Sequence, residues 1–135
     1  MGMQSGTETK SSFHLDNYQW HYRALLIFSP TEQDSDFQEQ IMLLRREQGG
    51  LQERELKLVY LFQDGESHAD QTAISEPIAE QIRMQFAVEA DEFAVILVGK
   101  DGTQKHRYAK PISARELFAA VDAMAMRQYE MQHKR

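Results

Sequence analysis

The chain has no cysteine among its 135 residues. This absence excludes disulfides, zinc or iron–sulfur sites with cysteine ligands, and any reaction that needs a thiol nucleophile. No apolar run approaches the ~18 residues needed to cross a bilayer, and no signal peptide is visible. The opening Met1-Gly2-Met3 resembles a cloned start, which leaves room for a signal peptide removed before cloning. The compartment is therefore unknown, and an exported location, periplasmic or secreted, stays open.

Positive charge is also in short supply. The chain has 15 Lys+Arg against 21 Asp+Glu, a formal net charge of -6, which gives no general attraction to nucleic acid or anionic lipid. The shortage is uneven, because residues 1–87 carry a balance of -7 and residues 88–135 a balance of +1. Any anion-binding surface is therefore expected in the C-terminal half.

The remaining composition is that of one small soluble domain, with 41% hydrophobic and 27% charged residues. We expect a mobile tail over residues 1–12, a single domain over residues 13–131 and a C-terminal tail over residues 132–135. Apolar runs predict strands over residues 24–28, 56–62 and 93–98, and a short strand over residues 104–108 after an Asp-Gly turn. Helical spacing predicts three helices, which begin after Thr31 or Asp34, at Ser75 and after Ser113.

Several local predictions accompany these strands and helices. Trp20 is expected to pin the lead-in segment to the core, and Gly49-Gly50 to end the first helix. The polar stretch 63–72 is expected to be a loop. Ser113 and Glu116 form a capping box before one final helix that continues past Met124.

The element order is βαβαββα, a right-handed βαβ unit followed by an antiparallel hairpin and a last helix. This is the order of a thioredoxin-like α/β fold, a four-stranded mixed sheet with flanking helices. Fold order alone does not define a function.

The C-terminal half carries more specific motifs. They are Val98-Gly99-Lys100-Asp101-Gly102, Lys105, Arg107, Pro111-Ile112, Glu116-Leu117-Phe118, Val121-Asp122, Met124-Ala125-Met126-Arg127 and Glu130-Met131. The lead-in Trp20 to Arg23 and the strand Leu25 to Pro30 belong to the same set. Together they resemble a family of unknown function with a thioredoxin-like, peroxiredoxin-related fold. Its members are small bacterial proteins and domains of vertebrate sushi-repeat and coiled-coil matrix proteins. The resemblance covers about residues 15–131 and implies a fold without an established activity.

The chain departs from that family at two places. Ala125 stands where the family commonly has proline between the two methionines. Residues 88–92, before the third strand, lack the proline that is common there.

In thioredoxin folds the reactive cysteine follows the first strand, at a helix N-terminus. Here that position reads Ser29-Pro30-Thr31, a degenerate site that we interpret first as a turn and helix cap. The alternative is a hydrolase-like enzyme that uses one of these hydroxyls. It would need an adjacent base, and His106 or Glu32 are the only candidates.

A basic hairpin is the stronger candidate for a binding surface. Six basic side chains fall within sixteen positions, and a seventh on the last helix could join them: Lys100, Lys105, His106, Arg107, Lys110, Arg115 and Arg127. We predict that Lys100, Lys105, Arg107 and Arg127 bind an anion or an acidic partner, since arginine gives bidentate contacts. The alternative is that these charges only solvate an edge strand and keep it from pairing.

The sequence predicts no catalytic residue, cofactor or metal site. No two of the five histidines lie four residues apart, the spacing of a helical metal pair. Nucleic acid is disfavoured because the aromatics are not interleaved with the basic residues. The preferred hypothesis is a non-catalytic binding module for a protein or a small anion. A structural, self-associating module, such as a homodimer, is a third possibility.

Overall fold

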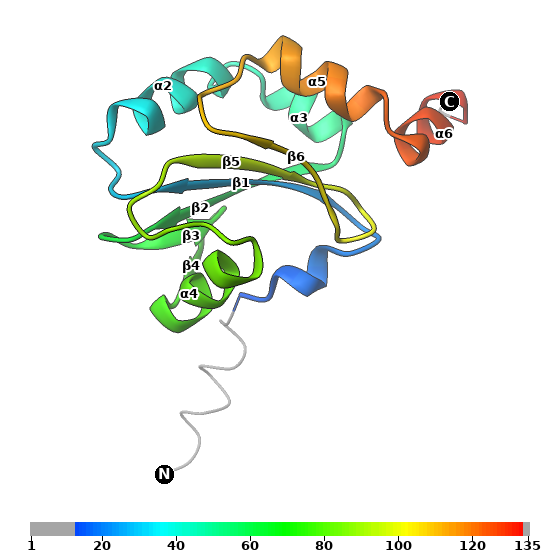
Figure 1. Cartoon of the computed structure of the whole chain (residues 1–135). Coiled ribbons are helices and arrows are strands. Elements are labelled where there is room, and N and C mark those ends of the chain that lie inside the picture. The colour runs from blue at the N-terminus through cyan, green and yellow to red at the C-terminus, as the bar shows by residue number, and fades with distance from the viewer. Residues whose placement is uncertain (1–12, 134–135) are drawn as a thin grey trace.

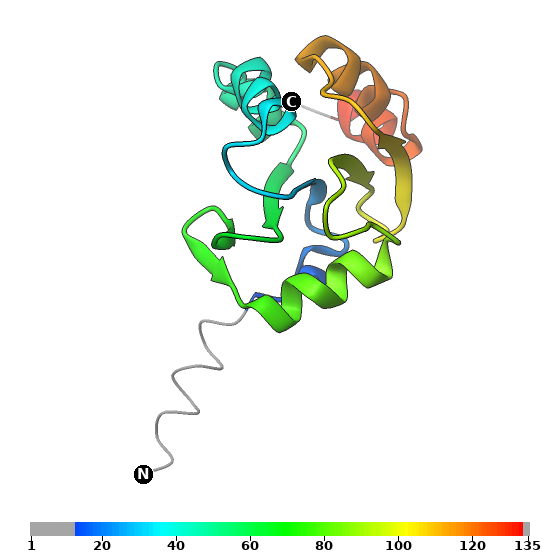
Figure 2. The same cartoon turned by 60° about the vertical axis from the view of Figure 1, so that its left-hand side comes forward.

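The computed structural model describes residues 13–133 and consists of one mixed sheet with helices on both faces (Figures 1 and 2). The predicted tail at residues 1–12 and the last two residues of the predicted C-terminal tail lie outside the described residues. The strands are β1 (Arg23–Ser29), β2 (Leu56–Phe62), β3 (Ser67–Ala69), β4 (Thr72–Ile74), β5 (Ala94–Val98) and β6 (Gln104–Tyr108). The helices are η1 (Leu15–Tyr18, a 3-10 turn), α2 (Ser35–Leu44), α3 (Gln48–Glu53), α4 (Glu76–Gln85), α5 (Ala114–Asp122) and α6 (Ala125–Gln132).

The sheet has the order β4-β3-β2-β1-β5-β6, with β1 and β2 parallel and the other neighbours antiparallel. β1 lies at the centre and is buried at all seven positions, as a continuous apolar run predicts. The thioredoxin-like α/β class is therefore confirmed, although the sheet has six strands in the described residues and not four.

The two additional strands form a short hairpin that begins in the stretch predicted to be a loop, residues 63–72, and ends at Ile74. β3 and β4 have three residues each, and Ala69 of β3 pairs with Val59 of β2. Polar strands of this length carry no periodic signal. They form here because β2 offers a free edge to β3, and β4 then pairs with the other side of β3.

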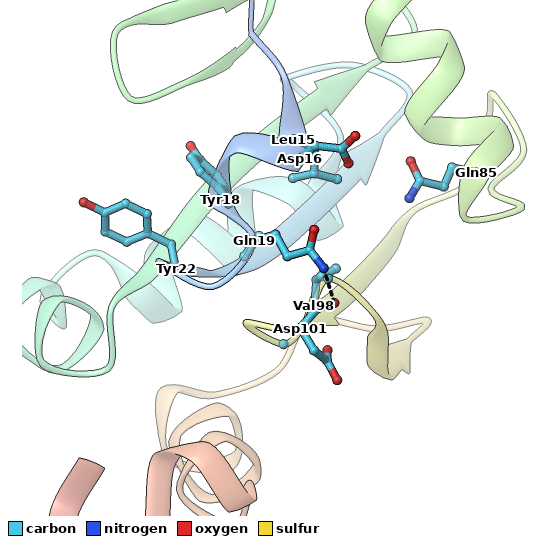
Figure 3. Close-up of a pocket in the computed structure, with 11 residues that line it drawn as sticks. Leu15, Asp16, Tyr18, Gln19, Tyr22, Gln85, Val98 and Asp101 are labelled. Atoms are coloured by element: carbon cyan, nitrogen blue, oxygen red, sulfur yellow. Dashed lines mark hydrogen bonds between the residues drawn. The ribbon is translucent and has the colours of Figure 1, made fainter. Parts of the chain in front are cut away.

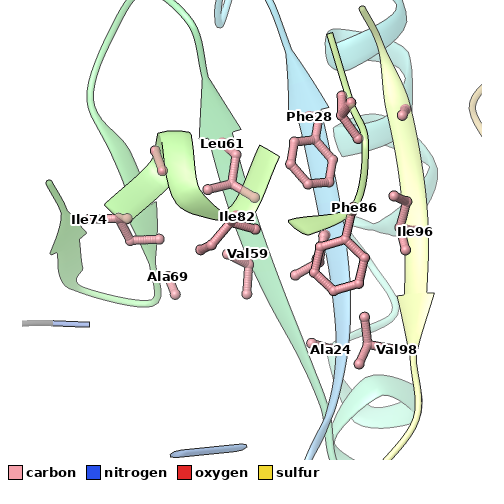
Figure 4. Close-up of a cluster of buried hydrophobic side chains, with 14 of the residues drawn as sticks. Ala24, Phe28, Val59, Leu61, Ala69, Ile74, Ile82, Phe86, Ile96 and Val98 are labelled. Atoms are coloured by element: carbon pink, nitrogen blue, oxygen red, sulfur yellow. The ribbon is translucent and has the colours of Figure 1, made fainter. Parts of the chain in front are cut away.

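The core lies on both faces of the central strands. One cluster packs alternate residues of β1, β2 and β5 against α4, and Phe28, Ile82 and Phe86 are among its members (Figure 4). The second cluster packs the intervening residues of the same three strands against the layer of α2, α3 and α5 (Figure 1). Gln40, fully buried in α2, holds that layer to the chain before α5, because its amide exchanges two hydrogen bonds of 2.9 Å with the backbone of Ile112.

Trp20 does not pin the lead-in segment, which corrects the sequence prediction. Its side chain is 60% exposed and its backbone takes a left-handed conformation, with φ 71°. Phe13 and Tyr18 anchor the segment instead, with their rings edge-to-face at 5.6 Å. Trp20 still ties the segment to the β5–β6 turn, since its N–H donates to the Lys100 carbonyl at 2.6 Å.

Two helix boundaries also differ from expectation. The first helix ends at Leu44, and the two glycines lie within α3. A Cβ on Gly50 would come within 2.6 Å of the Phe118 ring, so this glycine serves close helix packing and not helix termination. The final helix is broken into α5 and α6 at Met124, whose backbone is extended with φ -74° and ψ 145°.

Candidate functional site

The degenerate thioredoxin position forms a closed turn. Ser29 is only 2% exposed, and its hydroxyl donates to the Thr31 carbonyl at 2.8 Å. The carbonyl of Pro30 accepts the Asp64 N–H at 2.9 Å, which extends the contact between β1 and β2. Of the two predicted caps, Asp34 is the N-cap of α2, because its carboxylate accepts from two amides of the first turn. The turn and cap interpretation thus accounts for the hydrogen bonds of these residues.

The two hairpin cations on β6 reach in different directions. Lys105 donates to Asp101 at 2.9 Å across the β5–β6 turn. Arg107 reaches the C-terminal end of α4, where it donates to the carbonyls of Phe86 and Ala87 at 2.6 and 3.0 Å. It also pairs with a carboxylate before β5, at 3.2 Å. Both side chains keep about a third of their surface exposed, so they are accessible to a partner.

The other two predicted cations are buried and lie together. Lys100 and Arg127 are 8% and 3% exposed, and both contact the Glu130 carboxylate on α6. Lys100 also pairs with Glu55, and Arg127 pairs with Asp122 at 2.9 Å. The structure therefore separates the four predicted residues into an exposed pair on β6 and a buried pair, Lys100 in the β5–β6 turn and Arg127 on α6.

The sequence analysis missed Arg23, which completes this buried network. Arg23 is the first residue of β1 and is fully buried. It donates two hydrogen bonds to Glu130, at 3.1 and 3.3 Å, and one to the Arg54 carbonyl at 2.8 Å. Its Nε is buried without a hydrogen-bond acceptor in the described residues. The only available signal was a charge directly before an apolar run, together with its place in the family motif.

The carboxylates of the network are held in their charged form. Burial opposes the charge of Glu130, but hydrogen bonds from Lys100 and Arg23 outweigh it and lower the pKa of this group. Burial likewise opposes the charge of Asp122, and hydrogen bonds from Arg54 and Arg127 again lower its pKa. The network therefore joins charged groups from β1, the α3–β2 connection, the β5–β6 turn, α5 and α6.

Next to this network lies a cavity of about 120 Å³ between the β5–β6 turn and the start of α6. Three cations and one carboxylate contribute to its wall, and two methionines give it an apolar side. The lining residues are Arg23, Gly99, Lys100, Asp101, Lys105, Met124, Ala125 and Met126. Hydrogen bonds from the Lys105 ammonium and from the backbone and hydroxyl of Thr103 lower the pKa of Asp101 to about 2.

A second cavity, of about 80 Å³, lies on the lead-in side of the same turn (Figure 3). Gln19 crosses it and donates to the Asp101 carbonyl at 3.0 Å (Figure 3). Tyr18 forms part of its wall, and burial together with Asp70 and Tyr22 raises the pKa of this phenol to about 12. The wall thus presents the Tyr18 hydroxyl and two side-chain amides next to Asp16 and Asp101, and it shows no basic side chain to attract an anion.

Within residues 13–133 no group of three or more histidines and carboxylates could hold a metal ion. His106 stacks on Tyr108, with 6.0 Å between ring centroids. It lies beside Leu97 of β5, which pairs in turn with Leu25 near the start of β1. It is therefore several residues along the sheet from Ser29, at the other end of that strand. In the described part of the chain, no helix is both long and apolar enough to span a membrane.

Solved structures that share this arrangement include peroxiredoxins. The reduced 2-Cys peroxiredoxin of Plasmodium vivax has a TM-score of 0.65 and 16% identity, over 90% of this chain and 73% of its own. The mitochondrial 2-Cys peroxiredoxin of Plasmodium falciparum has a TM-score of 0.62 and 10% identity, over 89% and 83%. At these identities the likeness shows the fold alone, which is the thioredoxin-like fold of a chain that has no cysteine.

Sequence comparison gives the family. Residues 14–130 match the model of the Domain of unknown function (DUF4174), and the chain belongs to this family. It is 25% identical over 133 residues to Coiled-coil domain-containing protein 80 of Danio rerio. It is 26% identical over 134 residues to human Sushi repeat-containing protein SRPX.

The alignments cover 87% and 97% of this chain, but only 15% and 29% of these relatives. The chain therefore spans less than a third of the length of the curated proteins that it matches. Those proteins are vertebrate, so they give no support to the bacterial source that the family resemblance suggested.

Proposed function

We propose that this domain is a non-catalytic binding module, which takes an acidic, extended segment of a partner protein along the free edge of β6. The observation that carries the proposal is the position of β6. It is the last strand of the sheet, and Gln104 to Arg107 are all exposed. An edge strand presents unpaired backbone groups, to which an extended peptide can add as a further strand.

The charges of β6 favour an acidic occupant over a second copy of the chain. In antiparallel self-pairing centred on His106, Lys105 of each copy would lie opposite Arg107 of the other, and like charges directly opposite destabilise a strand pair. A segment with carboxylates at these positions would replace that repulsion with ion pairs. Asp101 and Glu92 already contact these cations, but both ion pairs are exposed to solvent and are worth little.

The turn at Ser29 supports a role without catalysis. Its hydroxyl is buried and donates to a carbonyl, whereas a nucleophile needs a base that accepts its proton. The family is one of unknown function, so it assigns no competing activity. An exported location and a partner with an acidic, extended segment are parts of the proposal.

A peptide titration tests this function. The probe is an eight-residue peptide of alternating Glu and Thr, added to ¹⁵N-labelled protein, with a Lys and Thr peptide as the opposite-charge control. We expect saturable shifts of the amides of residues 104–108, and much weaker binding in the Lys105→Glu, Lys110→Glu double variant. Arg107 is left intact because its bonds to α4 support the fold.

The matched control is Arg45→Glu with Arg46→Glu, which changes the net charge equally at two exposed residues after α2. Equal losses in the two double variants, or shifts that avoid residues 104–108, would contradict docking on β6. A rise in solution mass of the protein alone, with the same amides affected, would favour self-association in its place.

A further inference from the structure

The cavity beside α6 suggests a second site with a different ligand. We propose that it binds a small tetrahedral oxyanion, a phosphate or sulfate group, between the β5–β6 turn and the first turn of α6. This site is distinct from the proposed peptide edge, although Lys105 borders both.

The first turn of α6 supplies backbone donors. The N-cap is Met124, which makes no side-chain cap bond, and the first helix amide that finds a carbonyl is that of Gln128. The N–H groups of Ala125 and Met126 have no acceptor in the described residues, and both residues line the cavity. A helix N-terminus with free N–H groups attracts anions through its dipole and its donors.

A buried cation without a full set of acceptors is the second, independent observation. Arg23 lines the cavity and is fully buried, and its Nε has no partner. Buried guanidinium donors are ordinarily satisfied, so the unpaired Nε of this cavity-lining residue is a donor for which the chain itself provides no acceptor. Lys100 has three ammonium hydrogens and two carboxylate partners, which leaves one donor for a ligand.

Lys105 and Asp101 set the charge at the mouth of the cavity. Lys105 donates to one oxygen of Asp101, and Thr103 occupies the other through its N–H and hydroxyl, at 3.0 and 2.8 Å. Three of the four lone-pair sites of the carboxylate are therefore engaged, while Lys105 keeps two further donors. Donors from the turn, from β1 and from α6 approach the cavity from separate elements, which suits a tetrahedral anion better than a planar carboxylate.

The test is a titration of ¹⁵N-labelled protein with inorganic phosphate at constant ionic strength. We expect saturable shifts of the Arg23 Nε–H and of the Ala125 and Met126 amides, with a Kd on the order of 1 mM. Sodium acetate serves as the planar comparison and should bind more weakly. Phenyl phosphate distinguishes an organic phosphate ester from the free ion. Tighter binding than that of inorganic phosphate indicates an ester whose organic group contacts the methionines, and equal binding indicates the free ion.

Two variants remove donors without disturbing the buried ion pairs. Ala125→Pro removes one N–H at the first helical position, where proline is tolerated and the extended backbone of Met124 suits a following proline. Lys105→Gln removes a charge at the rim. Each should weaken phosphate binding about tenfold, the value of a hydrogen bond to a charged group.

Ala125→Gly and Lys110→Gln are the matched controls, because the first keeps the N–H and the second changes an exposed lysine that does not line the cavity. Shifts that grow linearly to roughly 50 mM phosphate, or equal losses in test and control variants, would overturn the site. The Ala125→Pro variant also separates this site from the peptide edge, since Ala125 lies on α6 and not on β6.

Discussion

Neutralising Glu130 should destabilise the domain more than any other single loss of a carboxylate charge in the described residues. Glu130 accepts hydrogen bonds from Arg23 and Lys100, and it also lies 3.6 Å from Arg127. In Glu130→Gln the shape is kept, but Arg23 keeps only the Arg54 carbonyl and a neutral amide oxygen. Because Arg23 is fully buried, its charge would lack compensation.

Breaking a buried ion pair from one side costs about 3–5 kcal/mol. The Glu130 side chain is 24% exposed, which places the expected cost near the lower value, about 3 kcal/mol. With a urea m-value of about 2 kcal/mol/M, the unfolding midpoint should fall by roughly 1.5 M. Lys100 and Arg127 contribute less to this loss because each keeps another carboxylate partner.

Urea unfolding followed by circular dichroism measures the effect. Glu39→Gln is the control, since Glu39 is exposed on α2, and it should change stability by less than about 0.5 kcal/mol. If Glu130→Gln proved as stable as Glu39→Gln, the network would not hold α6 to the sheet. A coupling energy near zero between Arg23→Leu and Glu130→Leu in a double-mutant cycle would refute the same reasoning.

Three further predictions concern the titration of Glu130, the buried Gln40 amide and the two glycines of α3. The Glu130 pKa is lowered in the folded state, so its stabilisation is complete above the unfolded pKa near 4.5 and is lost as the pH falls through the lower folded value; the stability gap to Glu130→Gln should therefore close below about pH 4.5 in acid unfolding curves. Gln40→Leu leaves both backbone groups of Ile112 unpaired and should cost about 2–4 kcal/mol, with faster hydrogen exchange at the Ile112 amide. Gly49→Ala should stabilise α3 by about 0.5–1 kcal/mol, since nothing lies within 4 Å of the added Cβ. Gly50→Ala should destabilise it, because the added Cβ meets an aromatic ring at 2.6 Å. Thermal melts of the two glycine variants would contradict this if they shifted in the same direction.

The candidate sites illustrate how far local patterns reach. The basic hairpin was visible as a charge cluster in sequence, but its division into an exposed pair and a buried pair was not. Lys100 and Lys105 are five residues apart, yet one is buried under α6 and the other is exposed on β6. Which of them a partner can reach depends on the position of α6, and that position depends on carboxylates far away in the chain.

By itself, the sequence determined the class of the fold and the chemistry that is excluded. The buried run of β1 and the apolar run of β5 are long enough to define central strands, and the absence of cysteine excludes thiol chemistry whatever the fold. Only the tertiary structure decided the β3–β4 hairpin, the break at Met124, the exposure of Trp20 and the burial of Arg23. The hairpin forms because β2 offers a free edge to β3, and Arg23 is buried because it meets a carboxylate 107 residues away in sequence. Local periodicity reports how much apolar surface a segment can bury, and it carries no information about which distant charge will meet it.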